Sequence, residues 1–150
     1  MEIFNDEYVQ KYGSLYTYLT CIIVDIDLEK QLLEVTSAGH PSCLLIHNDG
    51  STNFPKTGRM IGIAKGTRYD SYQYEFIPGN RLYLFTDGIF EEFNALEEEF
   101  GEIRLNEILK NSKELSLKDS IYEVLNRLDQ FLDGHEKQDD ITILGIGYKS

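Results

Sequence analysis

The sequence is poor in basic residues. Its 150 residues contain 14 Lys and Arg against 26 Asp and Glu, which gives a formal net charge of −12. A nucleic-acid backbone or an anionic membrane requires a positive protein face, so the charge argues against both as partners. The longest mostly apolar run, residues 18–24, is also far too short to cross a bilayer.

Cysteines are few, and several enzyme motifs are absent. The two cysteines, Cys21 and Cys43, stand in apolar runs, where a buried reduced thiol is the usual state. They indicate neither a disulfide scaffold nor a zinc cluster. The sequence contains no P-loop, no Gly-x-Ser-x-Gly nucleophile elbow and no His-Glu-x-x-His helix. With no secretion signal at its start, the sequence predicts a cytoplasmic protein.

What is present is the composition of one globular domain over residues 1–150. Apolar residues make up 41% and charged residues 27%, which is enough for a buried core. Strands are predicted at 15–27, 32–37, 43–47, 70–77, 81–86 and 141–148, and a short return strand is predicted to end near Phe54. Helices are predicted at 89–96, 101–111 and 116–133, with the end of another within 1–12. This order predicts an α+β fold whose first half is an antiparallel meander.

Two of these helices have specific sequence signals. Ser116 and Asp119 resemble a capping box at the start of the helix 116–133, and Gly134 is a plausible end signal. In the helix 101–111, Ile103, Ile108 and Leu109 are expected on one apolar face.

Asp87 is a candidate metal ligand. It follows an apolar strand and precedes Gly88, so its carboxylate is expected to be exposed and rigidly placed. An equally simple hypothesis makes Asp87 the N-cap of the helix 89–96, and the capping preference of Asp favours that hypothesis.

Asp139 and Asp140 form the second acidic position, just before the last strand. Adjacent carboxylates repel one another unless a cation offsets them, although a solvated turn is the more frequent case. Together with Asp87 they indicate a hard divalent cation such as Mg²⁺ or Mn²⁺. The three histidines are scattered, and no side chain is assigned as a catalytic acid, base or nucleophile.

Five short motifs in a fixed order carry a resemblance to a known family. They are Ser37-Ala38-Gly39-His40-Pro41, Gly58-Arg59-Met60-Ile61-Gly62-Ile63, the segment 78–91 around Thr86-Asp87-Gly88, Phe100-Gly101, and Asp139-Asp140-Ile141-Thr142. In this order they closely resemble the SpoIIE-like serine phosphatases, the bacterial branch of the PP2C-type (PPM) metal-dependent protein phosphatases. The resemblance extends from about residue 15 to the end.

The resemblance implies a β-sandwich of two antiparallel sheets with flanking helices. It also implies hydrolysis of phosphoserine or phosphothreonine on a partner protein, such as an anti-sigma-factor antagonist in signal transduction, with two Mn²⁺ or Mg²⁺ ions. By motif position, Asp87 and Asp139 are metal ligands on the same ion. Asp140 is not assigned a direct bond to metal, and Glu91, His40 and Pro41 are interpreted as structural.

The sequence also departs from the family pattern. The Gly-Gly-Asp-x-x-Asp and Asp-x-x-Gly-His-Gly segments of the family do not occur in residues 1–150. The resemblance is therefore to the C-terminal part of the domain, and we expect the fold to be truncated at its N-terminal side. Two carboxylates supply too few ligands for a two-metal centre, so we expect weak metal binding and little or no catalysis by this chain alone. Exposed sheet edges predict a homodimer. The alternative function is a non-catalytic regulatory or protein-binding module.

Overall fold

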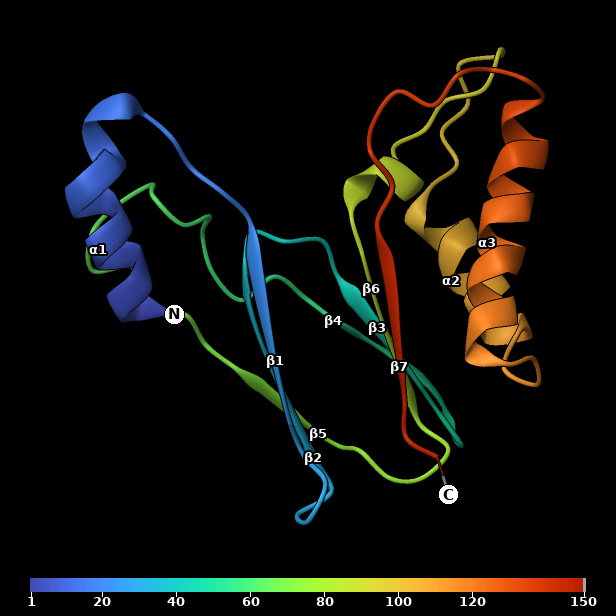
Figure 1. The fold of residues 1–150 in the computed structure, drawn as a ribbon, viewed down its shortest axis with the longest axis horizontal. Helices are drawn as coiled ribbons and strands as arrows, with labels where there is room; N and C mark the ends of the chain where they lie inside the picture. Colours follow the sequence, from blue (N-terminus) through green and yellow to red (C-terminus); the bar gives the residue numbers. More distant parts are fainter. Residues whose placement is uncertain (150) are drawn as a thin grey trace. The chain divides into compact units, whose positions relative to one another are not determined.

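The computed structural model describes residues 1–149; Ser150, the last residue of the predicted domain, lies outside them. Three α-helices, two 3-10 turns and seven strands form in this part of the chain (Figure 1). The helices are α1 (Glu2–Tyr12), α2 (Glu102–Asn111) and α3 (Leu117–Leu132), and the 3-10 turns are η1 (Gly13–Leu15) and η2 (Asp87–Ile89). The strands are β1 (Cys21–Asp27), β2 (Leu32–Ala38), β3 (Cys43–His47), β4 (Gly50–Phe54), β5 (Tyr72–Glu75), β6 (Arg81–Phe85) and β7 (Ile143–Gly147).

These elements form two compact units, which are described separately. The first unit consists of Met1–Ser42 and Phe54–Pro78, and the second of Cys43–Asn53 and the chain from Gly79 onward. Each unit contains one antiparallel sheet, so the two sheets and three helices confirm the predicted α+β class. No helix within residues 1–149 is long and apolar enough to span a membrane.

The first unit contains the sheet β1-β2-β5 and the helix α1. β1 and β2 form a hairpin in which Val24 lies opposite Val35, and β5 pairs with the other edge of β2. The fully buried Asn5 attaches α1 to the loop after Ile61 through two side-chain bonds. Asn5 Nδ2 donates to the carbonyl of Ala64 at 2.9 Å, and the Gly62 N–H donates to Asn5 Oδ1 at 3.1 Å.

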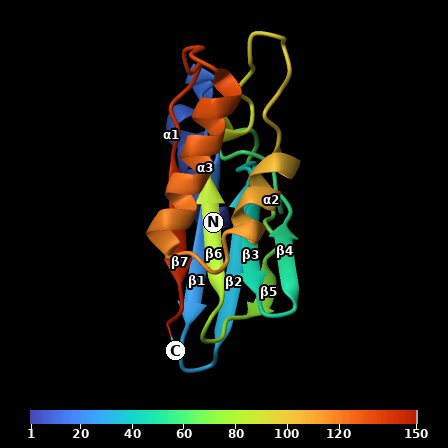
Figure 2. The same cartoon turned by 90° about the vertical axis from the view of Figure 1, so that its right-hand side faces the viewer.

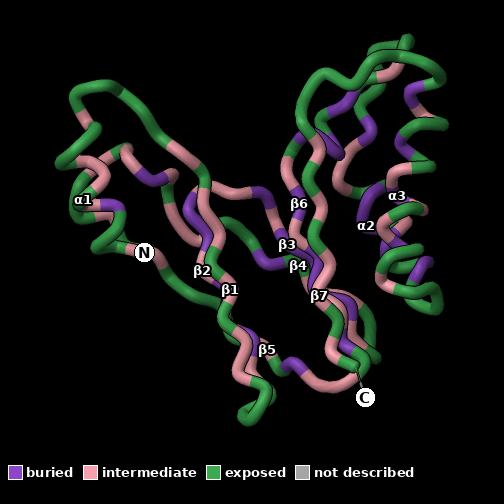
Figure 3. The backbone as a smooth tube through the Cα atoms, viewed as in Figure 1, coloured by how far each residue is buried: buried purple, intermediate pink, exposed green. Residues whose placement is uncertain are grey.

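The second unit contains the sheet β4-β3-β6-β7, covered on one face by α2 and α3 (Figure 2). β3 and β6 are the two central strands, and β6 pairs with both β3 and β7. Burial is most continuous along β3 and β6 and on the facing sides of the helices (Figure 3).

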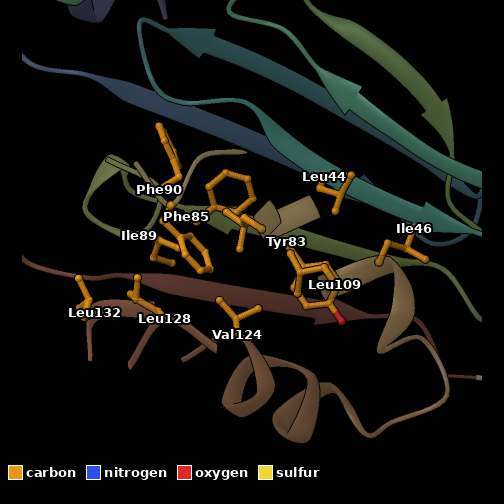
Figure 4. Packing of buried hydrophobic residues seen from close by; sticks show 12 residues of the cluster. Leu44, Ile46, Tyr83, Phe85, Ile89, Phe90, Leu109, Val124, Leu128 and Leu132 are labelled. Atoms are coloured by element: carbon orange, nitrogen blue, oxygen red, sulfur yellow. The ribbon is translucent and has the colours of Figure 1, made fainter. Parts of the chain in front are cut away.

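The core of the second unit joins the sheet to both helices. Leu44, Tyr83 and Phe85 from the strands pack with Leu109 of α2 and Leu128 of α3 (Figure 4). One polar contact lies within this core: the fully buried hydroxyls of Tyr83 and Ser120 are 2.8 Å apart, and Ser120 donates to the carbonyl of Leu117. Since a buried hydroxyl needs a partner, Tyr83 donates to Ser120 in turn.

Several element predictions are confirmed. β3 has the predicted bounds, and α3 begins after Ser116, whose Oγ accepts the N–H of Asp119 at 3.1 Å, as the capping box predicts. The helix within residues 1–12 is also present. At the other end of α3, however, Asp133 adopts the left-handed conformation that ends the helix, ahead of the predicted Gly134.

The helix predicted at 89–96 is wrong. The chain forms only η2 there, followed by a loop closed by a bridge between Phe93 and Glu99. The Asn94 side chain accepts the N–H groups of Leu96 and Glu98, at 2.9 and 3.1 Å, and so competes with a helical hydrogen-bond pattern.

Two further predictions fail because sequence pattern does not determine strand pairing or helix orientation. The expected meander is wrong, since β5 and β6 follow one another in sequence but pair in different sheets. Ile103 is 78% exposed, and Leu105 takes its place in the core beside Leu109.

Candidate metal centre

The first candidate ligand, Asp87, lies at the C-terminal end of β6. The strand buries Leu82, Tyr83 and Phe85, and the chain then turns sharply into η2. The Asp87 side chain is exposed, while the following Ile89 and Phe90 enter the core (Figure 4). The N-cap hypothesis is wrong, because no helix follows and Thr86, which occupies the N-cap position of η2, makes no side-chain cap.

Gly88 brings the Asp87 turn against the segment that carries Asp139. A Cβ atom on Gly88 would lie 2.5 Å from the carbonyl oxygen of Asp140 and 3.4 Å from the Cβ of Asp139. Such a contact with backbone cannot be relieved by a side-chain rotation. Glycine is therefore required at this position by close approach, and the two acidic segments pack directly on each other (Figure 1).

Thr86 joins the segment that carries Asp87 to the segment that carries Asp139 through hydrogen bonds. Its N–H donates to the carbonyl of Thr142 at 3.0 Å, and its Oγ1 accepts the N–H of Thr142 at 3.0 Å. The same hydroxyl donates to the carbonyl of Asp140 at 3.3 Å. These bonds extend the β6–β7 pairing beyond the ends of both strands, up to the acidic residues.

The second candidate ligand, Asp139, is also exposed and partly oriented. Its Oδ1 accepts the N–H of Asp140 at 2.7 Å, which fixes one carboxylate oxygen near the backbone. The other oxygen makes no hydrogen bond to the described residues. Asp139 also lines a cavity of about 610 Å³, together with Leu125, Lys137, Gln138, Asp140 and Ile141.

Glu92 is the residue that sequence reasoning missed. It is 1% exposed, and its carboxylate accepts the N–H groups of Gln138 and Asp139. Its neighbour Glu91, which matches the family motif, is exposed. The sequence alone does not distinguish these adjacent glutamates.

The donors present fit a hard cation but are few. Among residues 1–149, no group of three or more His, Cys, Asp or Glu side chains is placed to hold a metal. The three histidines belong to other surroundings: His40 lies 3.1 Å from the carbonyl of Pro41, His47 lies 3.3 Å from the Thr52 hydroxyl, and His135 is exposed. Two exposed carboxylates, Asp87 and Asp139, therefore form the candidate ligand set of this chain.

The fold is that of a PP2C-type phosphatase domain. The SiaA-PP2C domain of Pseudomonas aeruginosa superimposes with a TM-score of 0.83 at 22% identity, over 96% of this chain and 58% of that one. At this identity the likeness establishes the fold alone.

The sequence comparisons establish the family. The family model described as Stage II sporulation protein E (SpoIIE) matches residues 2–149. The chain belongs to the SpoIIE family of PP2C-type serine phosphatases.

Two curated relatives are similar over most of this chain. The phosphoserine phosphatase RsbP of Bacillus subtilis is 26% identical over 133 residues, which cover 88% of this chain and 31% of RsbP. Protein IcfG of Synechocystis is 26% identical over 144 residues, 95% of this chain and 22% of IcfG. The chain thus spans less than a third of the length of either relative.

Proposed function

We propose that this chain contributes metal ligands to a phosphoprotein phosphatase that hydrolyses phosphoserine or phosphothreonine. The observation that carries the proposal is the pair of exposed aspartates, Asp87 and Asp139, on segments that Gly88 and Thr86 hold together. Membership of the SpoIIE family and the relation to a phosphoserine phosphatase support the same reaction.

In this proposal each aspartate offers carboxylate oxygen to the metal from a different local setting. Asp87 offers an exposed carboxylate on a turn whose backbone carbonyl is already bonded to the N–H groups of Phe90 and Glu91. Asp139 offers the oxygen that its bond with the Asp140 N–H leaves free. Bound Mn²⁺ or Mg²⁺ supplies charge neutralisation of the phosphate and activation of the attacking water.

Catalysis requires further ligands beyond these two carboxylates. Mg²⁺ takes six oxygen ligands, and a two-metal site needs a group that bridges both ions. The family motifs Gly-Gly-Asp-x-x-Asp and Asp-x-x-Gly-His-Gly, which residues 1–150 do not contain, are the proposed source of these ligands. The chain alone is therefore proposed to bind the ions weakly.

The proposed substrate is a phosphorylated regulatory protein of the anti-sigma-factor antagonist type. This part rests on the resemblance to the family.

A homodimer through sheet edges is a separate proposal: β1 and β5 are the edge strands of one described sheet, and β4 and β7 are those of the other. Analytical ultracentrifugation tests it, and a strictly monomeric protein at high concentration would contradict it.

A phosphatase assay tests the central proposal. We would compare the chain alone with the chain fused to a family segment that carries both missing motifs, using a phosphoserine protein with and without Mn²⁺. The fused protein is expected to show manganese-dependent hydrolysis that Asp87→Asn or Asp139→Asn abolishes. Asp49→Asn, in the turn before β4, is the matched control and should leave the rate unchanged.

The alternative, a binding module without chemistry, makes the opposite prediction. The fused and folded protein would then show no manganese-dependent turnover, or turnover that survives both aspartate substitutions.

A further inference from the structure

Glu92 is a buried carboxylate in a chain whose other carboxylates lie mainly at the surface. It is 1% exposed, although a glutamate is almost never fully buried unless its charge has a partner. None of the ion pairs within residues 1–149 includes it. Its charge is instead balanced by backbone N–H groups.

Those N–H groups belong to the segment that carries the second candidate ligand. Glu92 Oε1 accepts the N–H of Gln138 at 2.9 Å and the N–H of Asp139 at 3.3 Å. Oε2 lies 3.1 Å from the same Gln138 nitrogen. One carboxylate therefore binds two consecutive peptide groups, and the second of them is that of Asp139 itself.

Glu92 is itself held in place by the core. Its carbonyl accepts the N–H of Phe100 at 2.8 Å, and the carbonyl of Phe90 accepts the N–H of Gly101 at 2.9 Å. Phe90 and Phe100 are both buried in the core of the second unit. The backbone of Glu92 is thus held by the core, whereas the N–H groups that its carboxylate accepts belong to an otherwise exposed loop.

We propose that Glu92 is a positioning residue for the metal site: it fixes the backbone of Gln138 and Asp139 and so keeps Asp139 packed against the turn that carries Asp87. This inference rests on the proposed function for its metal-binding consequence. Groups that orient metal ligands typically change metal affinity or activity by about 10–100-fold when they are removed. Glu91, exposed and adjacent, is the matched control.

Amide hydrogen exchange tests the positioning step without metal or activity. In Glu92→Ala, exchange at the Gln138 and Asp139 amides is expected to accelerate about tenfold or more, because both lose a charged acceptor. Glu92→Gln retains one oxygen acceptor and should restore most of the protection. Glu91→Ala should leave both amides unchanged. Unchanged exchange in Glu92→Ala, or equal acceleration in Glu91→Ala, would overturn the proposal.

A titration with Mn²⁺, followed by the electron paramagnetic resonance of the free ion, tests the consequence. Glu92→Ala should weaken Mn²⁺ binding about 10–100-fold, with partial rescue by Glu92→Gln. Altered exchange with unaltered Mn²⁺ binding would reduce Glu92 to a structural residue and overturn its role in metal binding. If neither the unsubstituted protein nor the chain fused to the missing motifs binds Mn²⁺, the proposed function is wrong, and so is the role of Glu92 in metal binding. The exchange result then decides separately whether Glu92 holds the loop.

Where Glu92→Ala does not fold, Glu92→Asp provides the same test. Its carboxylate is one methylene shorter and cannot reach both amides with the present backbone. It should accelerate exchange at Asp139, whose bond at 3.3 Å is the longer one, more than at Gln138. Protection of both amides in Glu92→Asp would contradict the inferred geometry.

Discussion

The helices α1 and α3 are attached to their units in contrasting ways. The buried residue of α1 is the polar Asn5, which binds a loop through amide hydrogen bonds. The buried residues of α3 include Val124, Leu128 and Leu132, which pack against a sheet. Both candidate ligands belong to the unit with the apolar helix attachment, where a continuous core supports the turn after β6. The contrast indicates that the turn carrying Asp87 is supported by apolar packing, whereas α1 is held largely by polar side chains, since Asp6 Oδ1 also accepts the Gly66 N–H at 2.8 Å.

Removal of an apolar anchor of α3 should have the largest effect. Leu128 is fully buried, so Leu128→Ala leaves a cavity under the sheet and should lower the free energy of unfolding by about 2–5 kcal/mol. Chemical denaturation measures this. Ile103→Ala, at a position 78% exposed on α2, is the control and should change little. Equal effects of the two substitutions would contradict the core described above.

A methyl group at Gly88 should separate the two acidic segments. Its Cβ would overlap the backbone of Asp140, and overpacking of this kind costs about 1–3 kcal/mol. Denaturation measures the loss of stability, and nuclear magnetic resonance should show shifted amide signals at Asp139 and Asp140. Gly147→Ala is the matched control, since its Cβ would make only ordinary contacts at 3.8 Å. A Gly88→Ala protein with native stability and spectra would disprove the close approach.

Loss of the polar anchor of α1 should act locally. Asn5→Ala leaves the Gly62 N–H and the Ala64 carbonyl without their partner, which costs about 1–3 kcal/mol for a buried group. We expect faster hydrogen exchange in α1 and in residues 61–66, with α3 unaffected. Asn5→Asp retains the acceptor for Gly62 and should have a smaller effect, and the exposed Gln10→Ala should have none. Unchanged exchange in α1 of Asn5→Ala would show that the remaining contacts of the helix, such as the bond between the Gly66 N–H and Asp6, hold it without Asn5.

The two cysteines differ in burial, and we expect this difference to have no effect on stability at neutral pH. Cys43, in β3, is 1% exposed, and its burial raises the pKa of the thiol to about 12 from an ordinary value of 9.0. Cys21, in β1, is half-buried. Because alkylation requires the thiolate, iodoacetamide should modify Cys21 well before Cys43 in the folded protein. Equal rates, followed by mass spectrometry, would contradict the burial of Cys43.

The same pKa shift gives a direction for the pH dependence of stability. Above pH 9 the unfolded state loses the Cys43 proton while the folded state keeps it, so ionisation favours unfolding. The stabilising contribution of this thiol is complete below pH 9 and decreases as the pH rises toward 12. Cys43→Ala should remove this part of the alkaline destabilisation.

The sequence predicts the regular elements well because local signals specify them. The capping box at Ser116 and the apolar positions of 116–133 are local, and α3 follows from them. The failures are non-local or competitive. Nothing in the sequence assigns β5 and β6 to different sheets, and at 89–96 the side chain of Asn94 outweighs a weak helical pattern.

The candidate site is predictable only in part, for a similar reason. Asp87 and Asp139 are found from motifs, and the structure shows that the segments carrying them pack together at Gly88. Glu92 could not be found, since its importance comes from burial against residues 46 and 47 positions away in sequence. The assignment of Asp87 and Asp139 as metal ligands stays a prediction.

Paramagnetic broadening by Mn²⁺ tests the central claim most directly. Small amounts of Mn²⁺ are added to the isotopically labelled protein, and the amide signals that broaden report which residues lie near the ion. We expect the signals flanking Asp87 and Asp139 to broaden together, and Asp87→Asn and Asp139→Asn each to weaken both effects. The acidic run Glu97, Glu98 and Glu99 is an internal control for non-specific attraction. Broadening there, with Asp87 and Asp139 unaffected, would contradict the proposed metal site.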